Sequence, residues 1–425
     1  MKDGTMKRKK RRSTTRTVIA TVFIIGLVVL LVNGLDIFSQ EENEPGEQDH
    51  VADTPNQPPK EPVEEVPEDP RTETLRITAV GDVIYHMSQI ESAYDAQSNT
   101  YDFKPFFELI KPIIQEADIA IANYEGTTAG LEVEPYMAYP RFNAPDETLD
   151  ALKYAGFNVI STINNHSLDM RKYGLIRTLE QLHKRGFKTV GTYEERPDTR
   201  VLYVEEKDIK LAFLAYTYGL NGMEVTLTTE ELDYMVNLID KTKILEDIED
   251  AKSESADMII AIMHWGNEYQ RNPSNEQKEL AEYMFSNGVD IILGSHPHVI
   301  QDAKTKTLDG DTKFVIYSMG NFISNQRQES LDHEYPNLDN FYTEDGVIVQ
   351  IEIEKDFGSS NTVIKEIEVI PTWVNRYRQA PLYHYDVIPI EFYLEGNPLG
   401  LDEHTLSRMQ RSYRDTMEKI DIEIN

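Results

Sequence analysis

Residues 75–82 read LRITAVGD, an apolar run that ends in a glycine and an aspartate. Its length and its branched side chains are typical of a buried β-strand. The arrangement recurs downstream, where residues 118–125 read DIAIANYE and residues 157–166 read FNVISTINNH. Between these runs, residues 105–117 and 147–155 have the spacing of apolar side chains that predicts helices. This β-α-β-α-β order predicts a parallel sheet covered by helices.

Downstream of this unit the pattern continues and then changes. A helix over residues 173–185 is expected to stop at Gly186, because glycine commonly ends a helix. Two short apolar runs around the polar residues 205–208 predict a β-hairpin. Two more buried strands are expected at 257–263 and 289–293, each ending in a histidine motif.

The last third of the chain reads mostly as β-structure. Strands are expected at 314–318, 346–354 and 362–373, and these late strands are predicted to form a second sheet packed on the first. Residues 406–420 have the pattern of one amphipathic helix. The predicted fold class is therefore α/β, with two sheets flanked by helices.

The N-terminal part has the pattern of a membrane anchor. Residues 18–32 read VIATVFIIGLVVLLV without a charge, and KRKKRR at 7–12 directly precedes them. Such a run is about long enough to span a bilayer, and the basic cluster places the N-terminus in the cytoplasm. A cleaved signal peptide is the alternative, although the small-residue cleavage pattern is missing.

The expected organisation has five parts. Residues 1–16 form a cytoplasmic basic segment, and residues 17–37 form a single transmembrane helix. Residues 38–73 are rich in Pro and Glu and poor in large apolar groups, which predicts a disordered stalk. Residues 74–380 form the folded domain, expected on the extracellular side, and residues 381–425 form a partly helical C-terminal extension.

Composition excludes some classes of function. The net charge of −32 argues against binding to a nucleic-acid backbone by bulk electrostatics. The chain has no cysteine, so it can form neither disulfides nor a thiolate metal site.

Side chains that can bind metals follow the predicted strands. The carboxyl ends of parallel strands meet at one edge of a sheet, so these side chains are expected to converge. Carboxylates, amide oxygens and imidazoles suit Mn²⁺, Fe²⁺ or Zn²⁺. The predicted ligands of two such ions are Asp82, Glu125, Asn165, His264, His296 and His298. A two-metal site of this kind can activate a water and clamp the oxygens of a displacement at phosphorus.

One residue is a candidate for catalysis and four more are candidates for supporting roles. His166, beside Asn165, could protonate a leaving group. His86 is a further possible ligand, Glu268 could orient an imidazole, Asn321 could line the site or cap a turn, and Arg141 could meet an anionic substrate. Each motif also has a simpler interpretation: Asn165-His166 alone is typical of a turn, and His264 after an apolar strand could be a core histidine.

Taken in order, the motifs resemble the CapA/PgsA family of poly-γ-glutamate capsule biosynthesis proteins, whose domain belongs to the calcineurin-like metallophosphoesterase superfamily. The resemblance covers about residues 75–325. The superfamily order is Gly-Asp, a second acidic motif, Asn-His, a lone His and His-x-His. The matching residues are Asp82, Glu125, Asn165-His166, His264 and His296-Pro-His298. The His-Trp-Gly, Gly-x-His-Pro-His and Tyr-Ser-x-Gly-Asn-Phe blocks are more specific to the capsule family.

The resemblance implies a metallophosphoesterase-like α/β/β/α sandwich. It also implies a membrane-anchored extracellular component of poly-γ-glutamate capsule synthesis, export or retention, with an amide ligase and a small multi-span membrane protein as partners. The alternative function is a metal-dependent hydrolase acting on a phosphoester or another wall-linked bond. Two departures from the superfamily pattern bear on activity. His86 lies four residues after Asp82 where Asp-x-His is usual, and Glu125 stands in Asn-Tyr-Glu-Gly where Gly-Asp-x-x-Asp is usual.

Overall fold

A computed structural model describes residues 71–333 and 335–423 of the chain. The predicted basic segment, the predicted anchor at 17–37 and all but the last residues of the predicted stalk lie outside these ranges. Among the helices that are described, none combines the length and apolarity needed to cross a bilayer.

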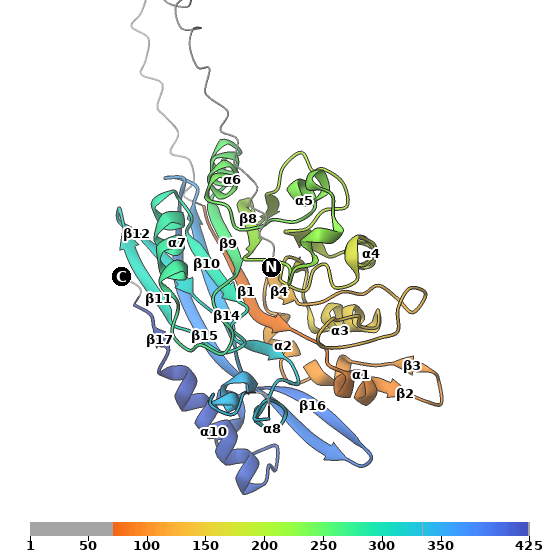
Figure 1. The fold of residues 1–425 in the computed structure, drawn as a ribbon. Coiled ribbons are helices and arrows are strands. Elements are labelled where there is room, and N and C mark those ends of the chain that lie inside the picture. Colours follow the sequence, from red (N-terminus) through yellow and green to blue (C-terminus); the bar gives the residue numbers. More distant parts are fainter. Residues whose placement is uncertain (1–70, 334, 424–425) are drawn as a thin grey trace, which may run out of the picture. The chain divides into compact units, whose positions relative to one another are not determined.

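The first of two large sheets has eight strands, in the order β16-β15-β14-β1-β4-β5-β6, with β13 paired to β1 (Figure 1). Its parallel half comprises β1 (Thr72–Val83), β4 (Ile119–Tyr124), β5 (Val159–Ser161), β6 (Lys188–Val190) and β13 (Asn321–Ile323). Its antiparallel half comprises β14 (Asp345–Asp356), β15 (Asn361–Gln379) and β16 (Leu382–Pro389).

The second sheet has seven strands, in the order β17-β11-β12-β10-β9-β8-β7. Its central strands β8 (Ile209–Thr217), β9 (Met258–His264), β10 (Ile291–Ser295) and β12 (Asp311–Ile316) are parallel. Its margins are β7 (Leu202–Glu206), β11 (Ala303–Leu308) and β17 (Ile420–Asp421). A separate ribbon pairs β2 (Tyr94–Asp95) with β3 (Thr100–Tyr101).

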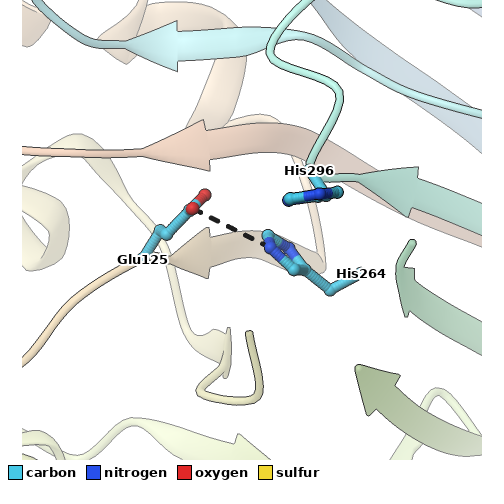
Figure 2. A group of neighbouring side chains, drawn as sticks. All are labelled: Glu125, His264 and His296. Atoms are coloured by element: carbon cyan, nitrogen blue, oxygen red, sulfur yellow. Dashed lines mark ion pairs between the residues drawn. The ribbon is translucent and has the colours of Figure 1, made fainter. Parts of the chain in front are cut away.

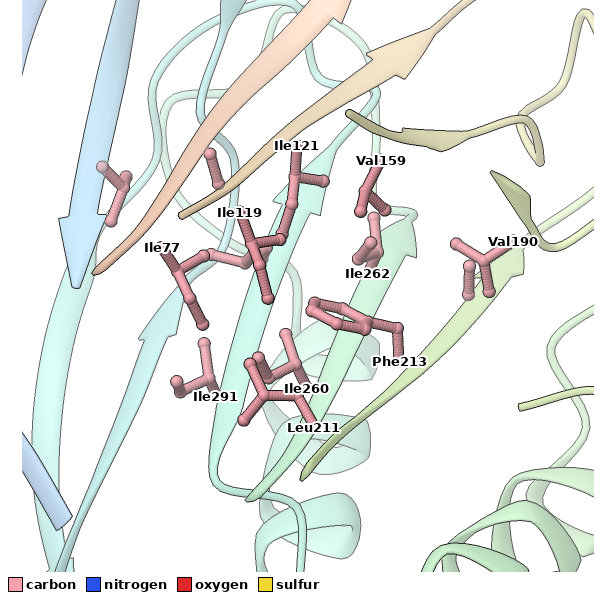
Figure 3. Close-up of a cluster of buried hydrophobic side chains, with 14 of the residues drawn as sticks. Ile77, Ile119, Ile121, Val159, Val190, Leu211, Phe213, Ile260, Ile262 and Ile291 are labelled. Carbon is pink, nitrogen blue, oxygen red and sulfur yellow. The ribbon is translucent and has the colours of Figure 1, made fainter. Parts of the chain in front are cut away.

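The two sheets pack face to face over a common apolar core (Figure 3). Side chains alternate along each strand, so Ile119 and Ile121 of β4 enter this core while Ala120 and Ala122 face the helices outside. On the other sheet, Ile260 of β9 enters the same core, as Figure 3 shows. Strands buried on both faces explain the continuous apolar runs in the sequence.

Helices cover the outer faces of both sheets and some sheet margins. The first sheet is covered by α1 (Met87–Ala93), α2 (Lys111–Ile114) and α3 (Glu147–Ala155), and the second by α6 (Lys241–Ser253) and α7 (Asn275–Ser286). The others are α4 (Arg171–Lys184), α5 (Thr229–Met235), α8 (Gln328–Leu331), α9 (Glu391–Leu394) and α10 (Glu403–Met417), with 3₁₀ turns η1 (Lys104–Phe107), η2 (Met223–Thr226) and η3 (Asn340–Glu344). The expected α/β class with two sheets flanked by helices is confirmed for the described residues.

The prediction that the late strands form the second sheet is confirmed for the strand expected at 314–318, which is β12 of that sheet, and is wrong for the strands expected at 346–354 and 362–373. Strand β14 pairs antiparallel with β1 and so extends the first sheet, while the hairpin and the strands that end in histidine motifs build the second. Val347, Val349 and Ile351 of β14 enter the core between the sheets. A strand with alternating apolar residues can bury them at the edge of either sheet. The alternation alone therefore does not predict which strand β14 pairs with.

The predicted helix over 105–117 is also wrong in its extent. The segment forms the short turn η1 and the four-residue α2 instead. Pro112 cannot donate a backbone hydrogen bond and restricts the residue before it, so one continuous helix is disfavoured. By contrast, α3 has the predicted bounds, and Gly186 just beyond α4 has the positive φ of 74° that suits glycine.

The folded domain extends beyond its predicted limits at both ends. Strand β1 begins at Thr72, and β16 continues the first sheet past residue 380. Helix α10 packs on this part of the sheet through Met409, which joins a buried cluster with Trp373. The predicted extension is therefore part of the same fold, because its apolar residues complete the outer face of that sheet.

Candidate metal centre

The predicted ligands converge where strands of both sheets end. Asp82 lies near the end of β1, Glu125 follows β4, and His264 ends β9. His296 and His298 follow β10. All five are buried, with exposed fractions of at most 2%. Parallel strands of two facing sheets thus supply polar groups to one point in an otherwise apolar interior.

Two glycines let the chain approach closely enough to place these side chains. A β-carbon on Gly81 would lie 2.0 Å from the Gly320 carbonyl oxygen, and one on Gly294 would lie 2.0 Å from that of Tyr317. The close approach allows the Asp82 backbone N–H to donate to the Gly320 oxygen at 3.0 Å. Only glycine fits at both points, which explains the Gly-Asp and Gly-Ser-His motifs.

Asp82 is held by donors on every side. Its Oδ1 accepts a hydrogen bond from Asn123 at 2.8 Å, and its Oδ2 accepts one from the His296 backbone N–H at 3.2 Å. The Nδ1 of His298 lies 3.1 Å from the same Oδ2. Although burial opposes ionisation, the contact with His298 lowers the pKa of Asp82, and Asp82 in turn raises the pKa of His298.

Glu125 has the opposite environment. Both of its carboxylate oxygens are buried, and neither has a hydrogen-bond partner within the described residues. They face imidazoles: Nε2 of His264 lies 3.8 Å from Oε1 (Figure 2). Nε2 of His298 lies 3.8 Å from the same oxygen. Burial raises the pKa of Glu125 well above its usual value, and the nearby Asp82 raises it further.

These side chains fit divalent cations. Three groups of donor atoms each lie within 4.8 Å of one another: Glu125, His264 and His296; Asp82, Glu125 and His298; and Glu268, His296 and His298. Buried acceptors without partners are uncommon in folded proteins, and a cation would supply the partner that Glu125 lacks. Nδ1 of His296 is a second buried atom without a partner. Burial lowers the pKa of His296 to about 3 and lowers that of His264, so both imidazoles are neutral, as ligation requires.

Asn165 and His166 reach the same place from the loop after β5. The Asn165 side-chain oxygen lies 2.8 Å from Nε2 of His264. The Nδ1 of His166 lies 2.7 Å from Oδ2 of Asp169, which also accepts the Phe142 backbone N–H at 2.6 Å. Asp169 therefore fixes the ring of His166, whose Nε2 lies 3.5 Å from the side-chain nitrogen of Asn221. His166 also lines the pocket described below.

The four further candidates are placed differently. Asn321 lies in the centre, with its oxygen 3.1 Å from Nδ1 of His298. Glu268 belongs to one of the donor groups, while His86 lies outside all three groups and accepts the Asn325 backbone N–H on Nδ1 at 3.2 Å. Arg141 is half-buried beside Phe142, belongs to none of the donor groups, and its charge favours a lower pKa of Asp169.

Three residues that shape the centre were missed. Asn123 donates to Asp82, Ser295 lies 3.0 Å from Nδ1 of His264, and Asp169 holds His166. Asn123 and Ser295 stand within the quoted motifs, one or two residues from a predicted ligand. Asp169 could have been found as an acidic residue three positions after the candidate catalytic histidine, within reach of its ring in one turn.

A pocket opens onto the centre. Its lining includes Glu125, His166, Glu268 and His298 from the centre, with Tyr139, Phe142, Tyr269 and Tyr335 as an aromatic wall. No lysine or arginine is among the described residues that line it. The described lining therefore offers a bound substrate no lysine or arginine to pair with.

Two solved structures that match most of this chain are a phosphatase and a phosphoesterase by their titles. A phosphatase from Mycoplasma pneumoniae is 13% identical, covers 79% of this chain and 100% of its own, and gives a TM-score of 0.42. The calcineurin-like phosphoesterase YfkN from Bacillus subtilis is 16% identical, covers 82% and 99%, and gives a TM-score of 0.39. Likenesses this weak carry no argument about substrate.

Sequence relatives are more informative. The capsule biosynthesis protein CapA of Bacillus anthracis is 28% identical over 260 residues, which is 60% of this chain and 61% of that protein. The PGA biosynthesis protein CapA of Bacillus subtilis (strain 168) is 26% identical over 280 residues, 65% of this chain and 67% of that protein. The match with the first of these relatives thus spans less than two thirds of its length.

The family assignment rests on a longer match. The model of the bacterial capsule synthesis protein family PGA_cap matches residues 76–326, which include every predicted metal ligand. This match covers more than half of the chain and confirms the resemblance inferred from the motifs. The chain belongs to the bacterial capsule synthesis protein PGA_cap family.

Proposed function

We propose that this protein serves poly-γ-glutamate capsule synthesis through a centre that holds two divalent ions of manganese, iron or zinc and hydrolyses a phosphoester or another wall-linked bond. The names of the two relatives support the biological role. One observation carries the metal centre: the buried carboxylate of Glu125 has no hydrogen-bond partner among the described residues and faces the neutral imidazole of His264 at 3.8 Å. A partnerless buried carboxylate is costly without a cation.

The side chains have separate tasks in this proposal. Asp82, Glu125, Asn165, His264, His296 and His298 would hold the ions. Bound ions would supply Lewis-acid polarisation and charge stabilisation at the scissile group. His166 would deliver a proton from Nε2 to the leaving group, while Asp169 holds Nδ1 and stabilises the imidazolium. The aromatic wall would exclude water around the bound substrate.

The location is part of the proposal. Residues 17–37 would anchor the chain in the cell membrane, with the N-terminus in the cytoplasm and the folded domain outside. The uncharged run at 18–32 after KRKKRR supports this arrangement. The partners would be poly-γ-glutamate itself, an amide ligase and a small multi-span membrane protein. Nucleic acid is not among them, because a net charge of −32 opposes it.

A second candidate is an accessory subunit without turnover. In that role the ions would bind the carboxylates of the polymer. The pocket lining favours this possibility in one respect. The described lining has no lysine or arginine, so the carboxylates of an anionic polymer would have to bind through the metal ions. The His166–Asp169 contact favours hydrolysis, because a site that only binds carboxylates needs no oriented proton donor.

The test compares turnover with function in cells. The full-length protein is loaded with Mn²⁺ or Zn²⁺ and assayed with phosphomonoesters and phosphodiesters, alongside His166→Ala, His296→Ala and the surface control His183→Ala. Hydrolysis by the wild type and the control, with loss in both site variants, is expected. No turnover from a metal-replete protein would overturn the hydrolase role. The same variants are then expressed in a capsule-deficient strain. If both His166→Ala and His296→Ala restored poly-γ-glutamate there, the centre would be dispensable and the accessory role would be excluded too.

A further inference from the structure

We propose that Glu268 is a direct ligand of one of the two metal ions, together with His296 and His298. The inference rests on the proposed metal centre and names a ligand that the motif order does not supply. It concerns the donor group of Glu268, His296 and His298, whose atoms lie within 4.8 Å of one another.

His86 lies outside every donor group, and its Nδ1 already has a partner. Its Nδ1 accepts the Asn325 backbone N–H, and its own backbone N–H donates to the Gln89 side chain at 2.7 Å, where α1 begins. Its ring packs edge-on against Phe142, with 5.5 Å between the ring centres. These contacts hold His86 at the rim of the pocket and outside every donor group.

The loop after β9 is built to bring Glu268 to the histidines. The Trp265 backbone N–H donates to the Ser295 oxygen at 3.1 Å, and the Tyr269 N–H donates to the Pro297 oxygen at 2.8 Å. Both ends of the loop are thus tied to the segment that carries His296 and His298. Gly266 has a φ of 89°, and a β-carbon there would lie 2.7 Å from the Gln277 side chain. Glycine therefore allows the turn that directs residue 268 back to the centre.

The Glu268 carboxylate has no competing partner. Among residues 71–333 and 335–423, it forms no hydrogen bond and no ion pair in the structure. It shares the pocket with the unpartnered carboxylate of Glu125, and the lining offers neither carboxylate a lysine or arginine. The buried Nδ1 of His296, also unpartnered, belongs to a ring in the same donor group. Carboxylates and imidazoles that converge with free donor atoms suit divalent ions such as Mn²⁺, Fe²⁺ or Zn²⁺.

The two ion positions differ in access to solvent. Glu125, His264 and His296 are all buried, whereas Glu268 is exposed at the pocket. The ion held by Glu268 therefore faces the pocket and exchanges with solvent more readily than the buried ion. Removal of this one carboxylate is expected to affect only the exchangeable ion.

The test measures bound metal rather than turnover. Full-length wild type, Glu268→Gln, His86→Ala and the exposed helix control Glu279→Gln are titrated with Mn²⁺ by calorimetry, and the retained manganese is counted after gel filtration. Two ions per chain are expected for the wild type, His86→Ala and Glu279→Gln. Glu268→Gln is expected to keep one ion and to bind the second at least tenfold more weakly. Thermal unfolding of each variant confirms that it is folded.

Other results would overturn the inference. Unchanged affinity for both ions in Glu268→Gln would exclude Glu268 as a ligand. Loss of one ion in His86→Ala, with both kept in Glu268→Gln, would assign the position to His86. These outcomes are separate from the hydrolase proposal: a wild type that binds two ions but hydrolyses nothing leaves Glu268 as a ligand, whereas a wild type that binds no ion removes both.

Discussion

Two carboxylates in the metal centre have opposite surroundings although both are buried. Asp82 is surrounded by donors, and Glu125 has none among the described residues. The motif pattern could predict both as ligands, because each follows an apolar strand. It could not predict this contrast, or that Asp169 holds His166, because those depend on contacts that form only when distant loops meet.

Replacement of Glu125 by Gln should separate stability from metal binding. The folded-state pKa of Glu125 lies above the unfolded value, so its ionisation destabilises the fold as pH rises above about 4.3. Metal-free Glu125→Gln should therefore melt at a higher temperature than the metal-free wild type at pH 8, and should gain less from added Mn²⁺. Calorimetric melting measures both. A metal-free variant that melts below the wild type would show that Glu125 is already satisfied within the protein.

Replacement of Asp169 by Asn should impair proton delivery and leave metal binding intact. The amide can no longer accept from Nδ1 of His166 as a carboxylate does, so kcat should fall by about 10²-fold or more, with little change in KM. The pH profile of kcat should shift, and the double variant with His166→Ala should be no worse than His166→Ala alone. If instead the two single variants each lowered kcat and the double variant lowered it by the product of the two factors, Asp169 would not act through His166.

At the scale of elements, the spacing of apolar residues predicted the helices and strands whose positions depend on neighbouring residues in the sequence. Helix α3 has the predicted bounds, and the strands that carry the motifs lie where their apolar runs predicted them. The pairing of β14 with β1 was not predictable, because it brings together residues more than 250 positions apart. Burial against the opposite sheet decides that pairing, and the sequence period is the same for either choice.

Helix α10 is tied to the pocket wall by a buried ion-pair network. Arg408 pairs with Glu344, which is fully buried and also accepts the indole N–H of Trp373 at 3.1 Å. Arg408 also pairs with Glu329 of α8 at 2.6 Å, next to the residues Ser330 and Leu331 that line the pocket. The C-terminal helix thereby supports one side of the candidate site.

Loss of Arg408 should therefore be destabilising. Arg408→Ala leaves the buried carboxylate of Glu344 short of a partner, which should lower the free energy of unfolding by about 3 kcal/mol. Arg414→Ala, an exposed change on the same helix, should stay within about 0.5 kcal/mol of the wild type. Urea denaturation compares the two. Glu344 also contacts Arg327 at 3.5 Å. Equal, small effects of the two changes would mean that Arg327 and Trp373 satisfy Glu344 without Arg408.

At the scale of the whole molecule, the centre exists only when the two sheets are packed together. Asp82 and Glu125 come from strands of the first sheet, and His264, His296 and His298 come from strands of the second. A bound ion would therefore bridge the sheets across the top of their shared core. The sequence predicted which side chains converge from the two sheets and the two-layer class, but it assigned β14 and β15 to the wrong sheet.

Metal binding should consequently stabilise the entire domain. An ion at about 100 times its Kd adds about 2.7 kcal/mol to the free energy of unfolding. Chelation should lower Tm, and Mn²⁺ should restore it, while His296→Ala should respond weakly to either. The stabilisation should disappear as pH falls and the ligands take up protons. A Tm that is insensitive to chelator in the wild type would contradict a centre that joins the sheets.

The most direct test of the central claim is anomalous scattering from crystals of the Mn²⁺-loaded protein. The proposed two-ion centre predicts two anomalous peaks among Asp82, Glu125, His264, His296 and His298, with ligand atoms about 2.0–2.2 Å from the ions. At least one oxygen of Glu125 should bind an ion. Crystals grown with excess Mn²⁺ that showed no peak among these side chains would contradict it.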